Sequence, residues 1–368
     1  MPLPRTLSLQ ALNRATLARQ LLLERANAPV VEAIERLAGM QAQIPKPPFV
    51  GLWSRLADFR RSALFDALHR RTIVRATMMR GTLHYMSAED YLGLRPALSD
   101  FLAQALRATL RTRLDGLDVA GVVEAARGVF AEHPHTFTAL RDRLMERFTD
   151  ADERVLGFTA RMHLPLVMVP DGSAWGYPAD AAFTLAEGWL SRPMGTDEGP
   201  SELVRRYLAA FGPATVADAQ AWSGLKGLKE TFEALRPELV TFRDARKREF
   251  FDLPDAPRPA EDVPAPARFL PEYDNLVLAH ADRTRLVADV HRPRIVTKNL
   301  KVLATFLIDG AVAGTWRIER KAKAATLVVE PFEPLSASRR DELEAEGEGL
   351  LRFCEEEART QDIRFASP

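Results

Sequence analysis

The most constraining feature of this 368-residue chain is an outline of helices followed by a two-stranded hairpin, which occurs three times. In the first copy, helical periodicity covers residues 9–23, 30–37, 49–59 and 63–70. Ser8 and Ser62 precede two of these segments and are the expected N-caps. The period then changes to that of strands over residues 73–77 and 82–86.

The second and third copies follow the same order. Helices are expected over residues 119–130, 137–148 (capped by Thr136) and 152–161. An apolar strand over 164–169 should turn at Asp171-Gly172 and return over 174–177. The third copy predicts helices over 201–210, 216–222 (capped by Thr215) and 226–235, then strands over 239–242 and 249–253.

Three copies of this outline predict an α+β fold with three tandem winged-helix units. The expected domains are residues 1–115, 116–195 and 196–255, and then 256–368 as a linker, a β-rich segment and a C-terminal helix. The stretch 254–266 is rich in proline and is expected to be a semi-rigid strap. In the last segment, strands are predicted over 301–307, 312–320 and 326–330, and a helix over 338–358.

The segment Met40-Gln41-Ala42-Gln43-Ile44 is the candidate site. It follows a helix that ends before Gly39, and Pro45 disfavours helical backbone at the preceding residue. On extended backbone, residues two apart share a face, so Gln41 and Gln43 are expected to point the same way. The simpler alternative is that both glutamines only cap the helix or lie on the surface.

Charge and cysteine content narrow the class of protein. Formal net charge is zero, with 50 basic and 50 acidic residues, which argues against a polycationic nucleic-acid binder. Residues 1–150 nevertheless carry 21 Arg/Lys against 15 Asp/Glu, a net of +6 that permits an anionic partner on one face. Cys354 is the single cysteine, and no apolar leader or membrane-spanning run is seen, so a cytoplasmic location is expected.

The sequence gives little support for a metal site, a catalytic cysteine or a nucleotide-binding loop. His133-Pro134-His135 has no cysteine nearby and, as we interpret it, no glutamate at metal-ligand spacing, so no metal site is expected. Cys354 lies among apolar residues of the predicted C-terminal helix and is interpreted as a packing residue. Phosphate-binding loops and hydrolase elbows are absent from the sequence, and no cofactor is expected.

Several motifs together resemble one family, the winged-helix DNA glycosylases that unhook interstrand crosslinks (the AlkZ/YcaQ type). The resemblance runs from about residue 8 to 360 and includes the motifs 39–43, 80–84, 212–215 with Trp222, 270–274, and Asp282-Arg283. It implies a C-shaped protein around a basic channel, and excision of bulky N7-alkylated purines with Gln41 and Gln43 as the catalytic pair. A related branch carries an acid at the second position, so Gln43 favours the crosslink-resistance branch.

Basic residues near the motif are candidate DNA contacts. Lys46 follows the glutamines, and Arg75 and Arg80 on the first hairpin are expected phosphate ligands. His84 is either a DNA contact or a buried, hydrogen-bonded histidine. Lys321 and Lys323 lie at a predicted hairpin tip, which either enters a DNA groove or is simply solvated.

The sequence therefore predicts a monomeric, monofunctional DNA glycosylase that acts on double-stranded DNA carrying cationic N7-alkylated purines, including crosslinks. Such a base is already weakly bonded to its sugar, so neutral amides suffice to orient water or stabilise developing charge. The alternative is a non-catalytic winged-helix DNA-binding regulator or a toxin-sequestering protein.

Overall fold

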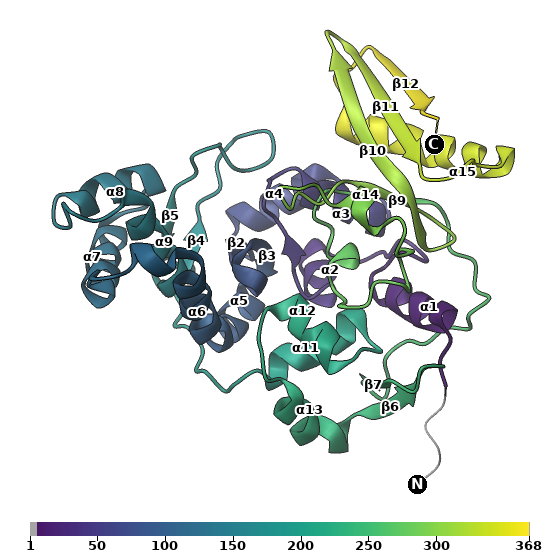
Figure 1. The fold of residues 1–368 in the computed structure, drawn as a ribbon. Coiled ribbons are helices and arrows are strands. Elements are labelled where there is room, and N and C mark those ends of the chain that lie inside the picture. The colour runs from purple at the N-terminus through teal and green to yellow at the C-terminus, as the bar shows by residue number, and fades with distance from the viewer. Residues whose placement is uncertain (1–5, 368) are drawn as a thin grey trace.

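The computed structural model describes residues 6–367 (Figure 1). Residues 1–5 and 368 lie outside this range, so the expectation about an apolar leader falls partly outside the described residues. The fold is of mixed α+β type, as predicted. Figure 1 places α7–α9 at one end of the molecule and the strands β10–β12 with α15 at another.

The first unit begins with the predicted helices, observed as α1 (Leu9–Arg19), α2 (Val30–Arg36), α3 (Pro47–Arg55) and α4 (Arg61–His69). The Ser8 side chain accepts a hydrogen bond from Ala11 N, which confirms the predicted cap of α1. The predicted cap Ser62 is wrong, because α4 already begins one residue earlier. The helix α3 begins with two prolines, which suit the first turn because they lack N–H groups that would need partners.

The hairpin of the first unit is formed by β2 (Ile73–Thr77) and β3 (Leu83–Ser87), close to the prediction. After it come two helices that the periodicity did not predict, α5 (Ala88–Leu94) and α6 (Ser99–Leu110). Short 3-10 helices also occur along the chain: η1 (Met79–Gly81), η2 (Pro96–Leu98), η3 (Arg111–Arg113), η4 (Arg236–Glu238) and η5 (Asn275–Val277).

The second unit contains α7 (Val119–Glu132), α8 (Phe137–Met145), α9 (Glu153–His163), β4 (Leu166–Met168), β5 (Phe183–Leu185) and α10 (Ala186–Leu190). Thr136 caps α8 as predicted. The predicted returning strand over 174–177 is wrong, because β4 pairs with β5. The Asp171 side chain accepts from Ser173 N, so this segment forms a local turn within a longer loop.

The strands of the first two units form one antiparallel sheet in the order β1-β3-β2-β4-β5, where β1 is Met40–Gln41. The two hairpins meet where Ala76 of β2 pairs with Val167 of β4. A hydrophobic core is also shared, since buried Ile73 and Leu83 cluster with Leu166. The sheet thus holds the Gln41 strand at its edge, on a scaffold built by two segments distant in sequence.

The third unit contains α11 (Ser201–Phe211), α12 (Val216–Ser223), α13 (Lys229–Leu235), and the antiparallel strands β6 (Val240–Arg243) and β7 (Glu249–Asp252). Thr215 and Asp218 form a capping box at the start of α12, which confirms the predicted cap. The helix α1 packs against α11, so the beginning of the chain is part of this region.

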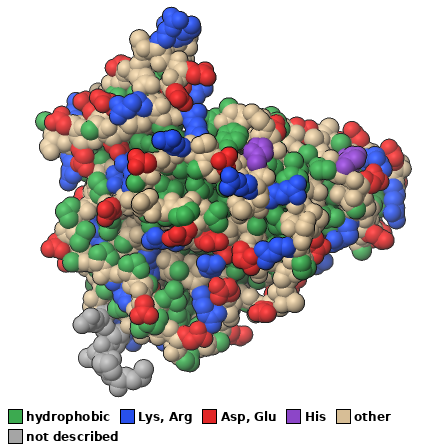
Figure 2. Space-filling model, turned by 180° about the vertical axis from the view of Figure 1, so that it is seen from behind, with side chains coloured by type: hydrophobic (Ala, Val, Ile, Leu, Met, Phe, Trp, Pro, Cys, Tyr) green, Lys and Arg blue, Asp and Glu red, His purple; other side chains and the backbone are tan. Residues whose placement is uncertain are grey.

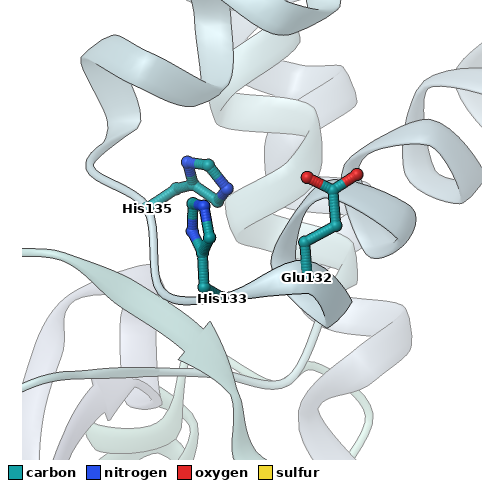
Figure 3. Close-up of side chains that lie close together, drawn as sticks. All are labelled: Glu132, His133 and His135. Carbon is teal, nitrogen blue, oxygen red and sulfur yellow. The ribbon is translucent and has the colours of Figure 1, made fainter.

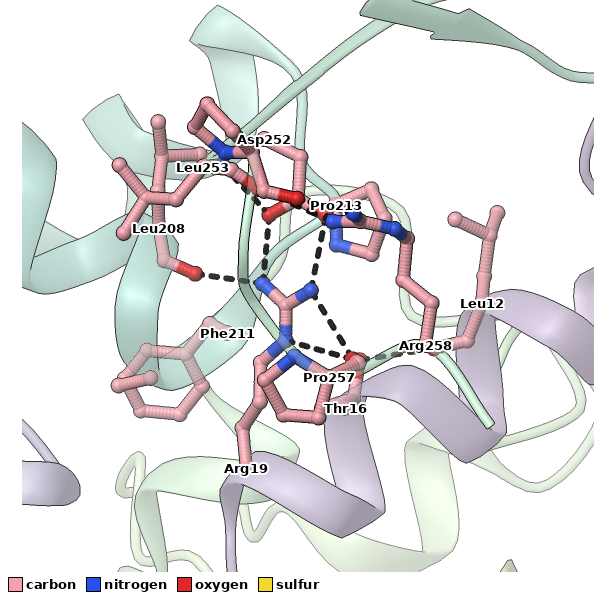
Figure 4. A network of polar contacts seen from close by, with 12 residues as sticks. Leu12, Thr16, Arg19, Leu208, Phe211, Pro213, Asp252, Leu253, Pro257 and Arg258 are labelled. Carbon is pink, nitrogen blue, oxygen red and sulfur yellow. Dashed lines mark hydrogen bonds and ion pairs between the residues drawn. The ribbon is translucent and has the colours of Figure 1, made fainter. Parts of the chain in front are cut away.

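A buried ion pair ties α1 to the third unit (Figure 4). The Arg19 guanidinium donates to both carboxylate oxygens of Asp252 at 2.7 and 2.8 Å, and to Leu208 O at 2.7 Å. Arg258, in the proline-rich strap, donates to the same carboxylate at 2.5 Å. Because Asp252 is fully buried, these donors compensate the loss of its hydration and fix the strap against the body.

The last segment forms a second sheet in the order β12-β11-β10-β9-β8. Its elements are β8 (Arg268–Leu270), α14 (Arg292–Ile295), β9 (Thr305–Ile308), β10 (Ala311–Lys321), β11 (Ala324–Pro331), α15 (Ala337–Cys354) and β12 (Thr360–Phe365). The sequence did not predict β8 and β12. In Figure 1 the hairpin β10–β11 projects away from the body of the molecule. Within the described residues, no helix is both long and apolar enough to cross a membrane.

Candidate active site

Gln41 and Gln43 lie beside neighbouring residues of β3, His84 and Leu83 respectively. Gln41 pairs with His84 in the sheet, which confirms extended backbone at this position. Gln41 is buried, whereas Gln43 is exposed, and the Gln43 Oε1 atom accepts from Leu83 N at 3.4 Å. That the two amides act on one spot stays a prediction.

Arg80 holds the Gln41 side chain. Its Nη2 donates to Gln41 Oε1 at 2.8 Å and approaches Asn275 Oδ1 at 3.5 Å, and its Nη1 donates to Trp222 O. Burial, and to a smaller extent Arg283, lower the pKa of Arg80 to about 10, so its side chain remains charged at neutral pH. Because protein acceptors occupy this guanidinium, its position does not support the expected phosphate contact.

Arg75 fixes the backbone of the glutamine motif. Its Nε donates to Ala42 O at 2.8 Å and its Nη2 to Gln43 O at 3.1 Å, and it stacks on the Tyr177 ring. Arg75 is 3% exposed. The expected role as a phosphate ligand therefore needs correction: this buried arginine satisfies carbonyls that the short strand β1 leaves without sheet partners.

His84 is fully buried, which matches the second of the two roles expected for it. Burial, followed by the nearby Arg80 charge, lowers the pKa of His84 to about 3, so the ring is neutral. Its Nδ1 lies 3.0 Å from Thr82 O. DNA contact by His84 is not supported, because the ring does not reach the surface.

The three candidate lysines differ in their surroundings. Lys46 forms an ion pair with Glu355 at 3.3 Å and lies over the Trp175 ring. Lys321 and Lys323 are exposed at the tip of the β10–β11 hairpin, as the sequence predicted. Figure 2, which views the molecule from behind, shows Lys and Arg side chains covering the tip of the projecting hairpin, with charges of both signs mixed over the rest of that face. Contact of these lysines with DNA stays a prediction.

Two cavities that share two lining residues lie near the glutamine motif. The smaller one is lined by Gln41, Arg55 and the segment 271–275. The larger, of about 490 Å³, is lined by Ile44, Lys46, Trp175 and Trp316 among others. Pro271 and Glu272 line both. Sequence reasoning did not single out Glu272, although the motif 270–274 was one of those that carried the family resemblance.

From the sequence, no glutamate was expected at metal-ligand spacing from His133 and His135, and this is wrong. Glu132 directly precedes the histidine pair, and ligand atoms of Glu132, His133 and His135 lie within 4.8 Å of one another (Figure 3). Arg143 lies 3.5 Å from the Glu132 carboxylate and competes for it. Cys354 is buried, and its burial raises the pKa of the thiol to about 11, which fits the predicted packing role.

Comparison with known proteins defines the class of this chain. Residues 34–353 match the family model described as DNA glycosylase AlkZ-like, so the chain belongs to the AlkZ-like DNA glycosylases, enzymes that act on N-glycosyl bonds. The predicted family is confirmed.

One curated relative is the interstrand DNA cross-link repair glycosylase of Streptomyces sahachiroi, which is 26% identical over 340 residues, covering 85% of this chain and 88% of that protein. The solved structure of Streptomyces sahachiroi DNA glycosylase AlkZ is similar in fold, with a TM-score of 0.80 at 22% identity, over 98% of this chain and 100% of that one.

Proposed function

We propose that this protein is a monofunctional DNA glycosylase that hydrolyses the N-glycosidic bond of cationic N7-alkylated purines, including interstrand crosslinks, in alkylation repair or self-resistance. The observation that carries the proposal is the Gln41 amide, held by Arg80 at 2.8 Å in the wall of a cavity within an AlkZ-like glycosylase. The curated relative named for cross-link repair supports this substrate class.

We infer different tasks for the two glutamines from their contacts. Because Arg80 occupies Gln41 Oε1, the NH2 group of Gln41 is the part of the amide that can hold a water molecule or a sugar-phosphate oxygen. The Gln43 Oε1 atom makes only a long 3.4 Å contact with Leu83 N, so a small movement makes it available to a developing positive charge at the sugar.

Departure of the base requires little further help. A purine alkylated at N7 carries a positive charge and leaves as a neutral molecule, so general-acid assistance is not needed. A metal or nucleotide cofactor is not required for this reaction. No lysine directly flanks the two glutamines in the sequence, which favours simple hydrolysis over lyase chemistry.

DNA is proposed to bind as a duplex to a single copy of this protein. Three winged-helix units would form a C-shaped basic channel, with the exposed lysines of the β10–β11 hairpin in a groove. A crosslinked base is difficult to rotate out of the duplex, so an open channel that reaches the sugar in place suits it better than a deep base pocket.

The test is release of the modified base. Duplex DNA carrying N7-methylguanine or a nitrogen-mustard crosslink is incubated with the protein, and free base and abasic sites are measured against unmodified DNA. Multiple turnovers on modified DNA alone are expected. A specific footprint on unmodified DNA with no base release would instead support a regulator.

A further inference from the structure

A carboxylate stands at the wall between the two cavities of the candidate active site. Glu272 lines the small cavity together with Gln41, and the large cavity together with Ile44, the residue that follows Gln43. Its side chain is 29% exposed, so it is accessible to a ligand and to water. Both glutamines are uncharged, which leaves Glu272 as a negative charge on the shared wall of these cavities.

The turn that presents Glu272 is fixed on both sides. The next residue, Tyr273, has a φ of 60°, a left-handed conformation that is unfavourable for a non-glycine residue and persists only where neighbours enforce it. Asp274 supplies that constraint, because it forms a buried bidentate ion pair with Arg55 of α3 at 2.8 and 2.9 Å.

The same turn is also bonded to the glutamine strand. Asn275 Nδ2 donates to Gly39 O at 3.2 Å, and Asn275 Oδ1 lies 3.5 Å from the Arg80 nitrogen that binds Gln41. The turn that carries Glu272 and the amide of Gln41 are therefore tied together by buried polar contacts through Asn275 and Arg80. Such fixation is expected for groups that must meet a substrate without reorganising.

We propose that Glu272 is a catalytic residue of the glycosylase reaction, an inference that rests on the proposed function. The C1′–N9 bond breaks and its electron pair leaves with the cationic purine, which becomes neutral, while the sugar becomes an oxocarbenium ion. The Glu272 carboxylate stabilises this positive charge. It then accepts the proton of the water molecule whose oxygen bonds to C1′.

Lys301 forms an ion pair with the proposed catalytic carboxylate. Its Nζ lies 2.7 Å from Glu272 Oε1, and the lysine side chain is 43% exposed. This ion pair keeps the carboxylate in place.

The test compares charge and volume at position 272. Single-turnover release of N7-methylguanine from duplex DNA is measured for wild type, Glu272→Gln and Glu272→Asp, together with the dissociation constant for the same DNA and the thermal unfolding midpoint. Glu272→Gln is expected to react at least tenfold more slowly with DNA affinity within threefold of wild type. Glu272→Asp should be faster than Glu272→Gln, because it retains the charge.

Glu333→Gln is the matched control, because Glu333 is a 77% exposed glutamate that pairs with His291. Its release rate should equal that of wild type. A Glu272→Gln rate within threefold of wild type would overturn the assignment of Glu272. In that case, base release by the wild-type protein would still leave the proposed function intact. If Glu272→Gln does not fold, Glu272→Ala takes its place: a rate at least tenfold below wild type supports the role, and a rate within threefold of wild type overturns it. Absence of base release by wild type would instead refute the proposed function.

Discussion

Arg80 donates a hydrogen bond to Gln41 across the edge of the sheet, with 2.8 Å between Nη2 and Oε1. Arg80 has a φ of 56° and lies in the turn between β2 and β3, so the hairpin turn itself orients the glutamine. Arg80 was expected to bind phosphate. Its hydrogen bond instead sets which end of the Gln41 amide faces the cavity.

Replacing Arg80 should impair base release without abolishing the fold. In Arg80→Met the Gln41 amide loses its orienting donor, so single-turnover excision of N7-methylguanine should slow at least tenfold, about 1.4 kcal/mol in the barrier. Arg70→Met, at an exposed position at the end of α4, is the control and should be unchanged. An Arg80→Met rate equal to wild type would show that Gln41 does not depend on this contact.

The glutamines themselves should affect chemistry more than binding. Gln41→Ala and Gln43→Ala are each expected to bind duplex DNA nearly normally and to release N7-alkylguanine at least tenfold more slowly. Gln10→Ala, at an exposed position on α1, is a matched control. If both variants release the base at the wild-type rate, the motif has no part in the mechanism.

Breaking the buried Arg55–Asp274 ion pair should destabilise the protein. Both side chains are at most 3% exposed, and Asp274→Asn leaves the arginine charge buried without its partner. The free energy of unfolding should fall by about 3–5 kcal/mol. Urea denaturation measures this, with the exposed Asp341→Asn expected to stay near wild type. A loss below 1 kcal/mol would mean that the pair does not hold the turn before η5.

Removing the hairpin lysines should weaken DNA binding in a salt-dependent way. If Lys321 and Lys323 each neutralise one phosphate, the double alanine variant should lower the slope of log K against log salt by about 1.8. Binding titrations over a series of salt concentrations measure this slope. A slope equal to that of wild type would mean that the hairpin tip is a solvated turn that does not contact phosphates.

Acid should destabilise the fold through buried histidines. Burial lowers the pKa of His84 and of His280 to about 3, whereas an unfolded histidine titrates near 6.5. The unfolded chain therefore binds more protons below pH 6.5, and stability present above that pH is lost as pH falls towards 3. The free energy of unfolding then changes with pH by up to about 1.4 kcal/mol per pH unit for each histidine. Urea denaturation between pH 7 and 5 should show that the free energy of unfolding of His84→Asn depends less steeply on pH than that of wild type. An equally steep pH dependence in the two proteins would contradict this account.

Local signals in the sequence predicted most of the helices and the strands at the hairpins. Ser8, Thr136 and Thr215 were recognised as caps because a cap bonds to backbone only three residues away. The strand predicted over residues 174–177 is not formed, and this shows what local sequence signals cannot decide. A polar pair such as Asp171-Gly172 reads as a hairpin turn, and only pairing with β5 decides where the chain returns.

The sequence by itself determined the family, the helical segments, the extended backbone at Gln41 and the exposed lysines of the hairpin tip, because periodicity, caps and proline geometry act within a few residues. Only the tertiary structure decided that Arg75 and Arg80 contact the glutamine motif and that Glu272 lines a cavity together with Gln41. Those outcomes depend on burial and on contacts between residues 33 to 236 positions apart in the sequence. Desolvation of an arginine is a property of what packs around it, and no local pattern encodes that.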